Sequence, residues 1–248
     1  ELSRSNRELE EFAFVASHDL QEPLRKIQAF SDRLESMFKD ELGEKGTDYI
    51  ARMKNAAQRM SNLINDLLEF SRVTTRGKDF TDTDLNSILN DIKSDLEIAI
   101  NECNAQIVTA NMPVIQADPS QMHQLFLNLI SNAVKFRGPN VDPVINIDFE
   151  RVSEFSEDHN SEISWHVITV RDNGIGFSDE YADKIFVPFQ RLHGRSQYKG
   201  TGIGLSVCRR IVERHGGSIA AISTLGEGAT FIIKLPVDAE LFTLKGEA

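Results

Sequence analysis

Two long runs of regularly spaced apolar residues occupy the first 70 positions of this chain. In residues 1–40, apolar side chains recur three, four or seven positions apart, which is the spacing of one helix face. The polar segment 40–46 contains two glycines and interrupts this spacing, and a second run extends from Thr47 to Phe70. The pattern predicts two long helices that form an antiparallel hairpin.

The predicted hairpin exposes a wider apolar stripe than one hairpin can bury. We expect two copies to pair as a dimeric four-helix bundle, because the heptad-like spacing of residues 1–12 is typical of a coiled coil. A homodimer is therefore predicted. The alternative is a hairpin that packs on the second domain of its own chain.

The rest of the chain alternates between helical and extended patterns. Helices are predicted at 84–102, 119–136 and 203–215, and strands at 105–109, 114–116, 143–150, 163–172 and, as a hairpin, 218–234. This order predicts an α/β sandwich with helices on one face of a mixed sheet. The expected division is a helical domain at 1–72, a linker at 73–80, an α/β domain at 81–236 and a tail at 237–248.

Composition limits the partners and the compartment. The net charge of -11 over 248 residues argues against binding to nucleic acids. Cys103 and Cys208 are predicted to be buried thiols of a reducing, cytoplasmic compartment. No apolar run reaches about 20 residues, so this part of the protein is not expected to contact a membrane. The chain begins at Glu1, and we expect a sensor domain or membrane anchor upstream of it.

His18 is the one histidine of residues 1–72, and Asp19 follows it directly. An imidazole can act as a nucleophile through one ring nitrogen while a carboxylate orients the other nitrogen. The pair therefore indicates a nucleophile with an assisting base. The alternative is an ordinary histidine on a solvated helix face.

Asn128 and Asn132 lie one turn apart on the predicted helix 119–136, and Lys135 follows them. Amide oxygens are suitable ligands for Mg²⁺, and a lysine can contact phosphate oxygens. A buried amide needs a hydrogen-bond partner, so the alternative is that both asparagines bond to adjacent loops.

Asp172 stands at the end of the strand predicted at 163–172 and is followed by Gly174 and Gly176. A carboxylate at this position can accept a hydrogen bond from the exocyclic amine of adenine, and the glycines allow close approach of the backbone. The alternative is an ordinary turn, which is the more frequent meaning of such a segment alone.

Gly200, Gly202 and Gly204 precede a predicted helix whose first amides suit a phosphate. A Walker P-loop is excluded because no Gly-Lys-Ser/Thr follows, and a dinucleotide-binding fingerprint is excluded because no strand precedes the glycines. The segment 184–199 contains no acidic residue and predicts a mobile lid over an anion, with four basic residues: Lys184, Arg191, Arg195 and Lys199.

Residues 14–24, which include Ser17-His18-Asp19, resemble the phosphoacceptor box of the sensor histidine kinases, particularly the subgroup linked to bacterial phytochromes. The N, G1, F and G2 boxes of that family resemble residues 124–136, 172–177, 186–189 and 200–205. The resemblance implies a Bergerat-type ATP-binding fold, which gyrase-like ATPases share.

The resemblance also implies a role for each matching residue. It makes His18 the phosphorylation site and Asp19 its assisting base, with ATP and Mg²⁺ as cofactors. It assigns Mg²⁺ to Asn132 with support from Asn128, and adenine to Asp172. Phosphate is then cradled by the last box, through Gly200, Gly202, Gly204 and Leu205.

The implied activity is ATP-dependent autophosphorylation of His18, followed by transfer of the phosphoryl group to an aspartate of a response regulator. Glu22 departs from many members of the family, which carry Thr or Asn there to hydrolyse the phosphoaspartate, so phosphatase activity is not expected. Two alternatives remain: an ATPase that does not need His18, and a dimeric scaffold that binds nucleotide without transfer.

Overall fold

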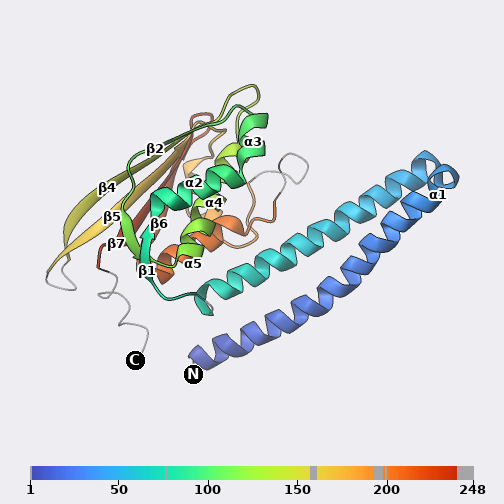
Figure 1. Ribbon diagram of the computed structural model, residues 1–248, viewed down its shortest axis with the longest axis horizontal. Helices are drawn as coiled ribbons and strands as arrows, with labels where there is room; N and C mark the ends of the chain where they lie inside the picture. Colours follow the sequence, from blue (N-terminus) through green and yellow to red (C-terminus); the bar gives the residue numbers. More distant parts are fainter. Residues whose placement is uncertain (1, 76, 157–160, 193–197, 199, 239–248) are drawn as a thin grey trace. The chain divides into compact units, whose positions relative to one another are not determined.

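The computed structural model describes residues 2–75, 77–156, 161–192, 198 and 200–238. The chain divides into two compact units, Glu1–Thr75 and Arg76–Ala248, which we call the helical unit and the sheet domain. The helical unit contains a single helical element, and the sheet domain combines strands with shorter helices (Figure 1). This division agrees with the predicted fold class, a helical hairpin followed by an α/β domain.

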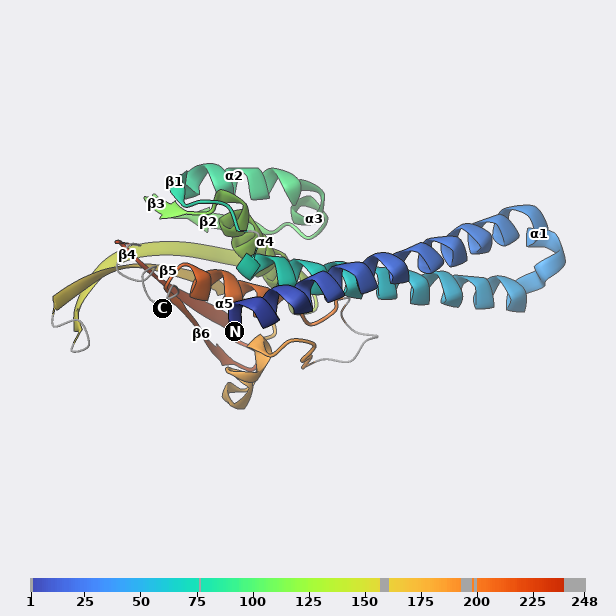
Figure 2. The same ribbon diagram turned by 90° about the horizontal axis from the view of Figure 1, so that it is seen from below.

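The helical unit is a hairpin formed by α1 (Leu2–Thr75) (Figures 1 and 2). The helix reverses between Phe38 and Gly43, the two residues whose backbone angles are not helical. Gly43 has a φ of 59° and a ψ of -178°, a combination that is essentially restricted to glycine. The predicted hairpin is confirmed, although its reversal starts two residues before the predicted segment 40–46.

Side chains join the two arms of the hairpin. Leu24, Ala57 and Ile64 form a buried cluster. Between the same two arms, Gln21 Nε2 donates to Asn65 Oδ1 at 2.7 Å. The cluster is small, and most of the apolar stripe predicted from the sequence is therefore not buried within one hairpin.

The sheet domain contains a five-stranded mixed sheet in the order β2-β4-β5-β7-β6. β2 is parallel to β4, and the other neighbouring pairs are antiparallel. A separate two-stranded sheet pairs β1 with β3. The strands are β1 (Thr81–Asp84), β2 (Gln106–Thr109), β3 (Val114–Ala117), β4 (Val144–Ser156), β5 (Ser161–Asp172), β6 (Ser218–Thr224) and β7 (Gly228–Pro236).

Helices lie against one side of the five-stranded sheet, as predicted for an α/β sandwich (Figure 1). These are α2 (Leu85–Asp95), α4 (Pro119–Lys135) and α5 (Gly204–Arg214). The core beneath them includes Ile147, Val170 and Phe231, which stand opposite one another on β4, β5 and β7 and are buried. The short helices are α3 (Glu97–Glu102) and the 3₁₀ turns η1 (Asp179–Tyr181) and η2 (Lys184–Phe186).

Several boundaries differ from the sequence-based expectation. The helix predicted at 84–102 is divided at Leu96 into α2 and α3. β4 and β5 are longer than the strands predicted at 143–150 and 163–172, and their ladder stays paired out to Ser156 and Ser161 (Figures 1 and 2). In these outer parts apolar residues no longer alternate with polar ones. α1 continues through Thr75, so the first three residues of the predicted linker 73–80 are helical. β1 was not predicted.

Cys103 and Cys208 are buried free thiols, as predicted. Burial raises the pKa of Cys208 to about 12, so its thiol is protonated at neutral pH. Among the described residues, no helix combines the length and the apolar character that a membrane span requires.

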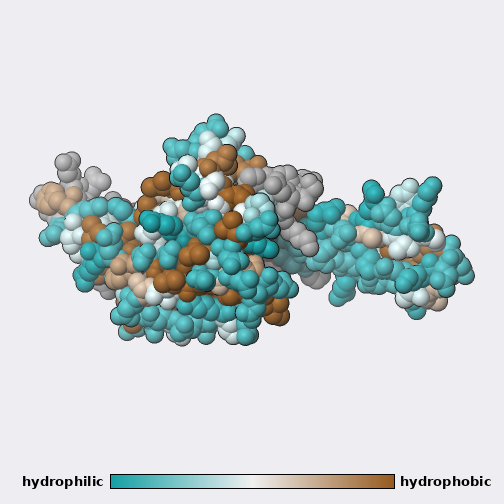
Figure 3. All heavy atoms as spheres, turned by 90° about the horizontal axis from the view of Figure 1, so that it is seen from above, coloured by the Kyte–Doolittle hydropathy of each residue, from teal (hydrophilic) through white to brown (hydrophobic). Residues whose placement is uncertain are grey.

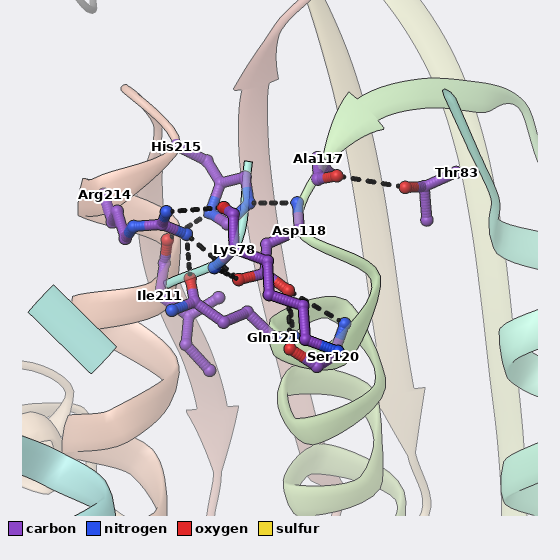
Figure 4. Close-up of polar contacts among 9 residues, drawn as sticks. All are labelled: Lys78, Thr83, Ala117, Asp118, Ser120, Gln121, Ile211, Arg214 and His215. Atoms are coloured by element: carbon purple, nitrogen blue, oxygen red, sulfur yellow. Dashed lines mark hydrogen bonds and ion pairs between the residues drawn. The ribbon is translucent and has the colours of Figure 1, made fainter. Parts of the chain in front are cut away.

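Asp118 and His215 form a buried junction between the start of α4 and the end of α5 (Figure 4). The Asp118 carboxylate caps α4 by accepting hydrogen bonds from the backbone N–H groups of Ser120 and Gln121. The Asp118 N–H donates to His215 Nε2 at 3.1 Å, and His215 Nδ1 lies 2.7 Å from the Ile211 carbonyl oxygen. Because Nε2 accepts, the neutral ring carries its proton on Nδ1.

This junction predicts that stability depends on pH through His215. Burial lowers its pKa to about 4, against the opposing effect of the hydrogen bond to Ile211. Since an unfolded histidine has a pKa near 6.5, only the unfolded chain takes up this proton between those values. The free energy of unfolding should therefore fall as the pH drops from about 6.5 to about 4, by up to about 3 kcal/mol.

The variant His215→Gln keeps an acceptor close to Nε2 but has no group that titrates in this window. Urea denaturation of both proteins across the window measures the effect, and the variant should show the shallower dependence on pH. Equal slopes for the two proteins would contradict the role assigned to His215.

Candidate functional site

Asn128 and Asn132 lie one turn apart on α4, and both are half-buried rather than fully buried. Asn128 Nδ2 donates to the carbonyl oxygen of Gly204, the first residue of α5, at 3.4 Å. Asn132 Oδ1 accepts a hydrogen bond from Lys135 Nζ at 3.5 Å. The alternative that these asparagines bond to adjacent segments therefore applies to Asn128, whose side-chain nitrogen binds Gly204. The side-chain oxygen of Asn132 instead faces the Lys135 ammonium group.

Lys135 is a partly desolvated cation beside Asn132. Its Nζ lies 4.1 Å from the centroid of the Phe136 ring. Burial lowers the pKa of Lys135 to about 8, and the positive charge of Arg191 acts in the same direction. Two cationic groups close to one another indicate a place where an anion is electrostatically favoured.

The segment 200–204 meets α4 at this point. A Cβ atom on Gly200 would lie 3.1 Å from Lys135 Nζ, and the φ angles of Gly200 and Gly202 are 146° and 84°. Gly202 O accepts a hydrogen bond from Phe189 N at 3.0 Å, and Gly200 O accepts one from Arg191 Nη1 at 2.7 Å. Glycine is thus favoured at both positions by the backbone angles, and at Gly202 also by the carbonyl oxygen of Gln190, which would lie 2.9 Å from a Cβ atom.

The segment then enters α5 at Gly204, without a side-chain hydrogen bond from the N-cap residue Ile203. The first amides of a helix have no partner within the helix, and the positive end of its dipole favours an anion. Gly204 and Leu205 therefore bring backbone N–H groups to the side of the domain that Asn128 and Lys135 also line. This arrangement is suitable for the phosphate groups of a nucleotide.

Asp172 ends β5 and is half-buried. Its Oδ1 accepts hydrogen bonds from Gly174 N at 2.8 Å and from Ala229 N at 3.2 Å. Burial raises the pKa of Asp172, and these two hydrogen bonds partly oppose that effect. Within the part of the chain that the structure describes, no donor binds Oδ2, which leaves one carboxylate oxygen for an outside donor.

Gly174 and Gly176 pack against protein backbone. A Cβ atom on Gly174 would lie 2.6 Å from the carbonyl oxygen of Phe136, and one on Gly176 would lie 2.1 Å from that of Thr224. Ile175 N donates to the same Phe136 oxygen at 2.9 Å. The two glycines therefore join the end of β5 to the end of α4 and to the β6–β7 turn, and any contact with a nucleotide stays a prediction.

His18 and Asp19 lie on the first arm of α1, in the other unit. The backbone of His18 is helical, and its side chain lies outside the described residues. Asp19 is exposed. The structure thus brings the predicted residues of α4 next to the 200–204 segment, and it joins the segment after Asp172 to the end of α4 through Phe136. His18 and Asp19 lie on a separate unit.

Arg191 has a structural role that the sequence analysis did not identify. Its two terminal nitrogens bind the carbonyl oxygens of Gly200 and Tyr198, at 2.7 and 2.6 Å. The sequence indicated only a basic segment. Its contacts with carbonyl groups depend on the path of the backbone, which charge patterning does not specify.

Comparison with known families assigns both units. Residues 8–76 match the family described as His Kinase A (phospho-acceptor) domain, and residues 117–239 match the family described as histidine kinase-, DNA gyrase B-, and HSP90-like ATPase. The chain belongs to the sensor histidine kinases. The hairpin is thus the phosphoacceptor domain of a histidine kinase, and the sheet domain is its ATPase-like domain.

Relatives of this histidine kinase include cyanobacterial phytochrome A from Nostoc sp., which is 41% identical over 237 residues. That alignment covers 96% of the chain and 30% of the phytochrome. The sensor protein kinase WalK from Staphylococcus saprophyticus is 32% identical, over 96% of the chain and 38% of the relative. The chain therefore spans about a third of the length of these relatives.

Solved structures share the fold of this histidine kinase. Histidine kinase ThkA in complex with the response regulator protein TrrA superimposes with a TM-score of 0.60 at 26% identity, over 96% of the chain and 65% of ThkA. Full-length ShkA in complex with AMPPNP has a TM-score of 0.65 at 22% identity, over 91% of the chain and 45% of ShkA.

Proposed function

We propose that this histidine kinase transfers the γ-phosphoryl group of ATP to His18. The observation that carries the proposal is the convergence of Asn132, Lys135 and the 200–204 segment on one place of the sheet domain. Amide oxygens, a cation and free helix amides are together the groups that bind phosphates and a hard divalent cation. The ShkA structure, which contains AMPPNP, supports ATP as the nucleotide.

Each group of the site is assigned one part of the nucleotide. Asp172 Oδ2 accepts a hydrogen bond from the exocyclic amine of adenine, while Oδ1 keeps its hydrogen bonds from Gly174 N and Ala229 N. Gly200, Gly202, Gly204 and Leu205 surround the phosphates, and Lys135 contacts their oxygens. Asn132, supported by Asn128, fits a magnesium ion because its oxygen is a neutral hard donor, and bound Mg²⁺ neutralises phosphate charge.

The chemical step is an in-line displacement at the γ-phosphorus. The unprotonated ring nitrogen of His18 attacks, a P–N bond forms, and the P–O bond to the β-phosphate breaks, so that ADP leaves. The proton on the other ring nitrogen passes toward Asp19, which orients the imidazole. The protein mainly positions the reacting groups and stabilises the charge of the transferring phosphoryl group, because a loose transition state leaves little covalent chemistry for protein side chains.

The second step gives the phosphoryl group to an aspartate in the receiver domain of a response regulator. The complex of ThkA with the response regulator TrrA supports this class of partner. An upstream sensor domain is also part of the proposal. The cytoplasmic location and the domain boundaries expected from the sequence stay predictions.

The active form is proposed to be a homodimer. Hydrophobic atoms reach the surface of the protein among hydrophilic ones (Figure 3). On the helical unit, large apolar side chains on both arms are exposed beside the small buried cluster, and two hairpins could cover them in a four-helix bundle. They include Leu20, Ile27, Phe30, Leu34, Met37, Phe38, Met53, Met60, Leu63 and Leu67.

Labelling with ATP tests the proposed transfer. Purified chain and the variant His18→Gln are incubated with γ-labelled ATP and Mg²⁺, and the labelled band is then treated with acid and with alkali. We expect an acid-labile, alkali-stable label on the unmodified chain and at least a hundredfold less on the variant, because a P–N bond is acid-labile and the variant lacks the nucleophile.

Equal ATP binding by both proteins is the required control. Label that persists on His18→Gln would show that another residue is the nucleophile. Release of free phosphate at the same rate from both proteins, without label, would favour the ATPase alternative.

Asp172→Asn tests the adenine contact. The amide retains an oxygen for Gly174 N and Ala229 N, but it replaces Oδ2 by a donor that faces the adenine amine. Affinity for ATP, measured by calorimetry, should fall at least tenfold, or about 1.4 kcal/mol, while the melting temperature changes little. Asp179→Asn, a change at an exposed aspartate, is the matched control; equal affinity for all three proteins would contradict the contact.

A further inference from the structure

The chain that follows the helical unit is bound to the sheet domain at Lys78. The Lys78 N–H donates to Asp118 Oδ2 at 2.6 Å, and Arg214 Nη2 donates to the Lys78 carbonyl oxygen at 2.8 Å (Figure 4). Arg214 Nη1 binds Gln121 Oε1 at 2.8 Å and lies 3.3 Å from Asp118 Oδ2. One guanidinium group therefore connects the segment after α1 to the first turn of α4.

The residues on both sides of Lys78 fit the same surface. A Cβ atom on Gly77 would lie 2.0 Å from Arg214 Cζ, so the backbone at Gly77 passes directly over the guanidinium group. The Phe80 ring stacks on His215 with a centroid distance of 4.5 Å and an interplanar angle of 8°. Arg214 Cζ lies 5.0 Å from the Phe80 ring centroid. We call these contacts of residues 77–80 the linker clamp.

The clamp includes a buried charge. The side chain of Asp118 is fully buried and that of Arg214 is 20% exposed. Burial tends to raise the pKa of Asp118, but hydrogen bonds from Ser120, Lys78 and Gln121 outweigh it, and the pKa is lowered. A buried carboxylate is costly when it loses a partner, so release of Lys78 from Asp118 is opposed.

We infer that Arg214 is a positioning residue for autophosphorylation, because the linker clamp keeps the connection between the nucleotide site and His18 short. The inference rests on the proposed function. The clamp holds the segment from Gly77 to Phe80 on the sheet domain. Only one residue separates Gly77 from Thr75, the last residue of α1. The sequence-based linker 73–80 is shortened from both ends: its first three residues are helical, and Gly77, Lys78 and Phe80 contact the sheet domain.

The expected magnitude follows from chain length. Four extended residues span at most about 14 Å, so release of the clamp would add that much reach between the two units. Effective concentration falls with about the -3/2 power of linker length. Opening of the clamp would lengthen the stretch between Thr75 and the sheet domain from one residue to five, which would lower the effective concentration about tenfold. The turnover rate should change, and the affinity for ATP should not.

The variant Arg214→Ala in the whole chain tests the inference. We expect kcat for labelling of His18 to fall about tenfold, with ATP affinity and KM unchanged. Trypsin should cut faster after Lys78, because a clamped backbone cannot enter the protease in an extended form. Lys78→Ala is the matched control for the rates: its side chain is exposed and the clamp uses only its backbone, so kcat should stay unchanged.

A second variant leaves the clamp intact and covers the case in which Arg214→Ala does not fold. Two glycines inserted between Arg76 and Gly77 lengthen the connection outside the clamp, and they should also lower kcat at constant ATP affinity. In the Arg214→Ala background, the insertion should lower kcat less than it does alone. The linker is already longer in that background, so two added residues increase its length by a smaller fraction.

Three results would overturn the inference. One is an unchanged kcat in Arg214→Ala although cleavage after Lys78 is accelerated. Another is a parallel loss of kcat and ATP affinity, which would make Arg214 a support of the nucleotide site. The third is an unchanged kcat after the insertion. Failure of the proposed function is distinct, because the unmodified chain would then carry no label while the trypsin measurement would still report on the clamp.

Discussion

The packing of α4 against α5 is the contact on which the rest of the sheet domain depends. The buried face of α4 meets α5 through its apolar side chains, and Cys208 Sγ lies 3.8 Å from the Leu125 carbonyl oxygen at the centre of the contact. At one end, Asn128 binds Gly204, where the glycine segment enters α5. At the other end, Asp118 meets His215 and Arg214. One helix pair therefore carries both the proposed nucleotide site and the linker clamp.

The division of the chain into two units imposes the main functional constraint. The proposed nucleophile His18 belongs to the hairpin, whereas the groups suited to ATP belong to the sheet domain. Transfer then requires the two units to meet, and the connection between them sets how often they do so. The clamp fixes the point at which this connection leaves the sheet domain. The contacts of Lys78 with Asp118 and Arg214 are thereby proposed to influence the rate of phosphoryl transfer.

The sequence predicted those features that have a strong local signal, and it missed those that depend on the path of the backbone. The hairpin follows from helical periodicity, and its reversal from the glycine at 43. The outer ends of β4 and β5 were missed because their side chains no longer alternate in polarity. Gly174 and Gly176 were noticed as glycines, but their contacts with carbonyl groups of distant segments have no pattern in the sequence. The clamp was missed for the same reason, because Lys78 takes part through its backbone.

The central claim is that the γ-phosphoryl group of ATP becomes bonded to a histidine nitrogen of this chain. Phosphorus NMR of the chain after incubation with ATP and Mg²⁺ tests it most directly, since it distinguishes a protein-bound phosphoramidate from free phosphate in one spectrum. The account predicts a protein-bound phosphoramidate signal that disappears on acidification and is absent from His18→Gln. A spectrum in which ATP is consumed and only free phosphate and ADP appear, under conditions where phosphohistidine is stable, would contradict it.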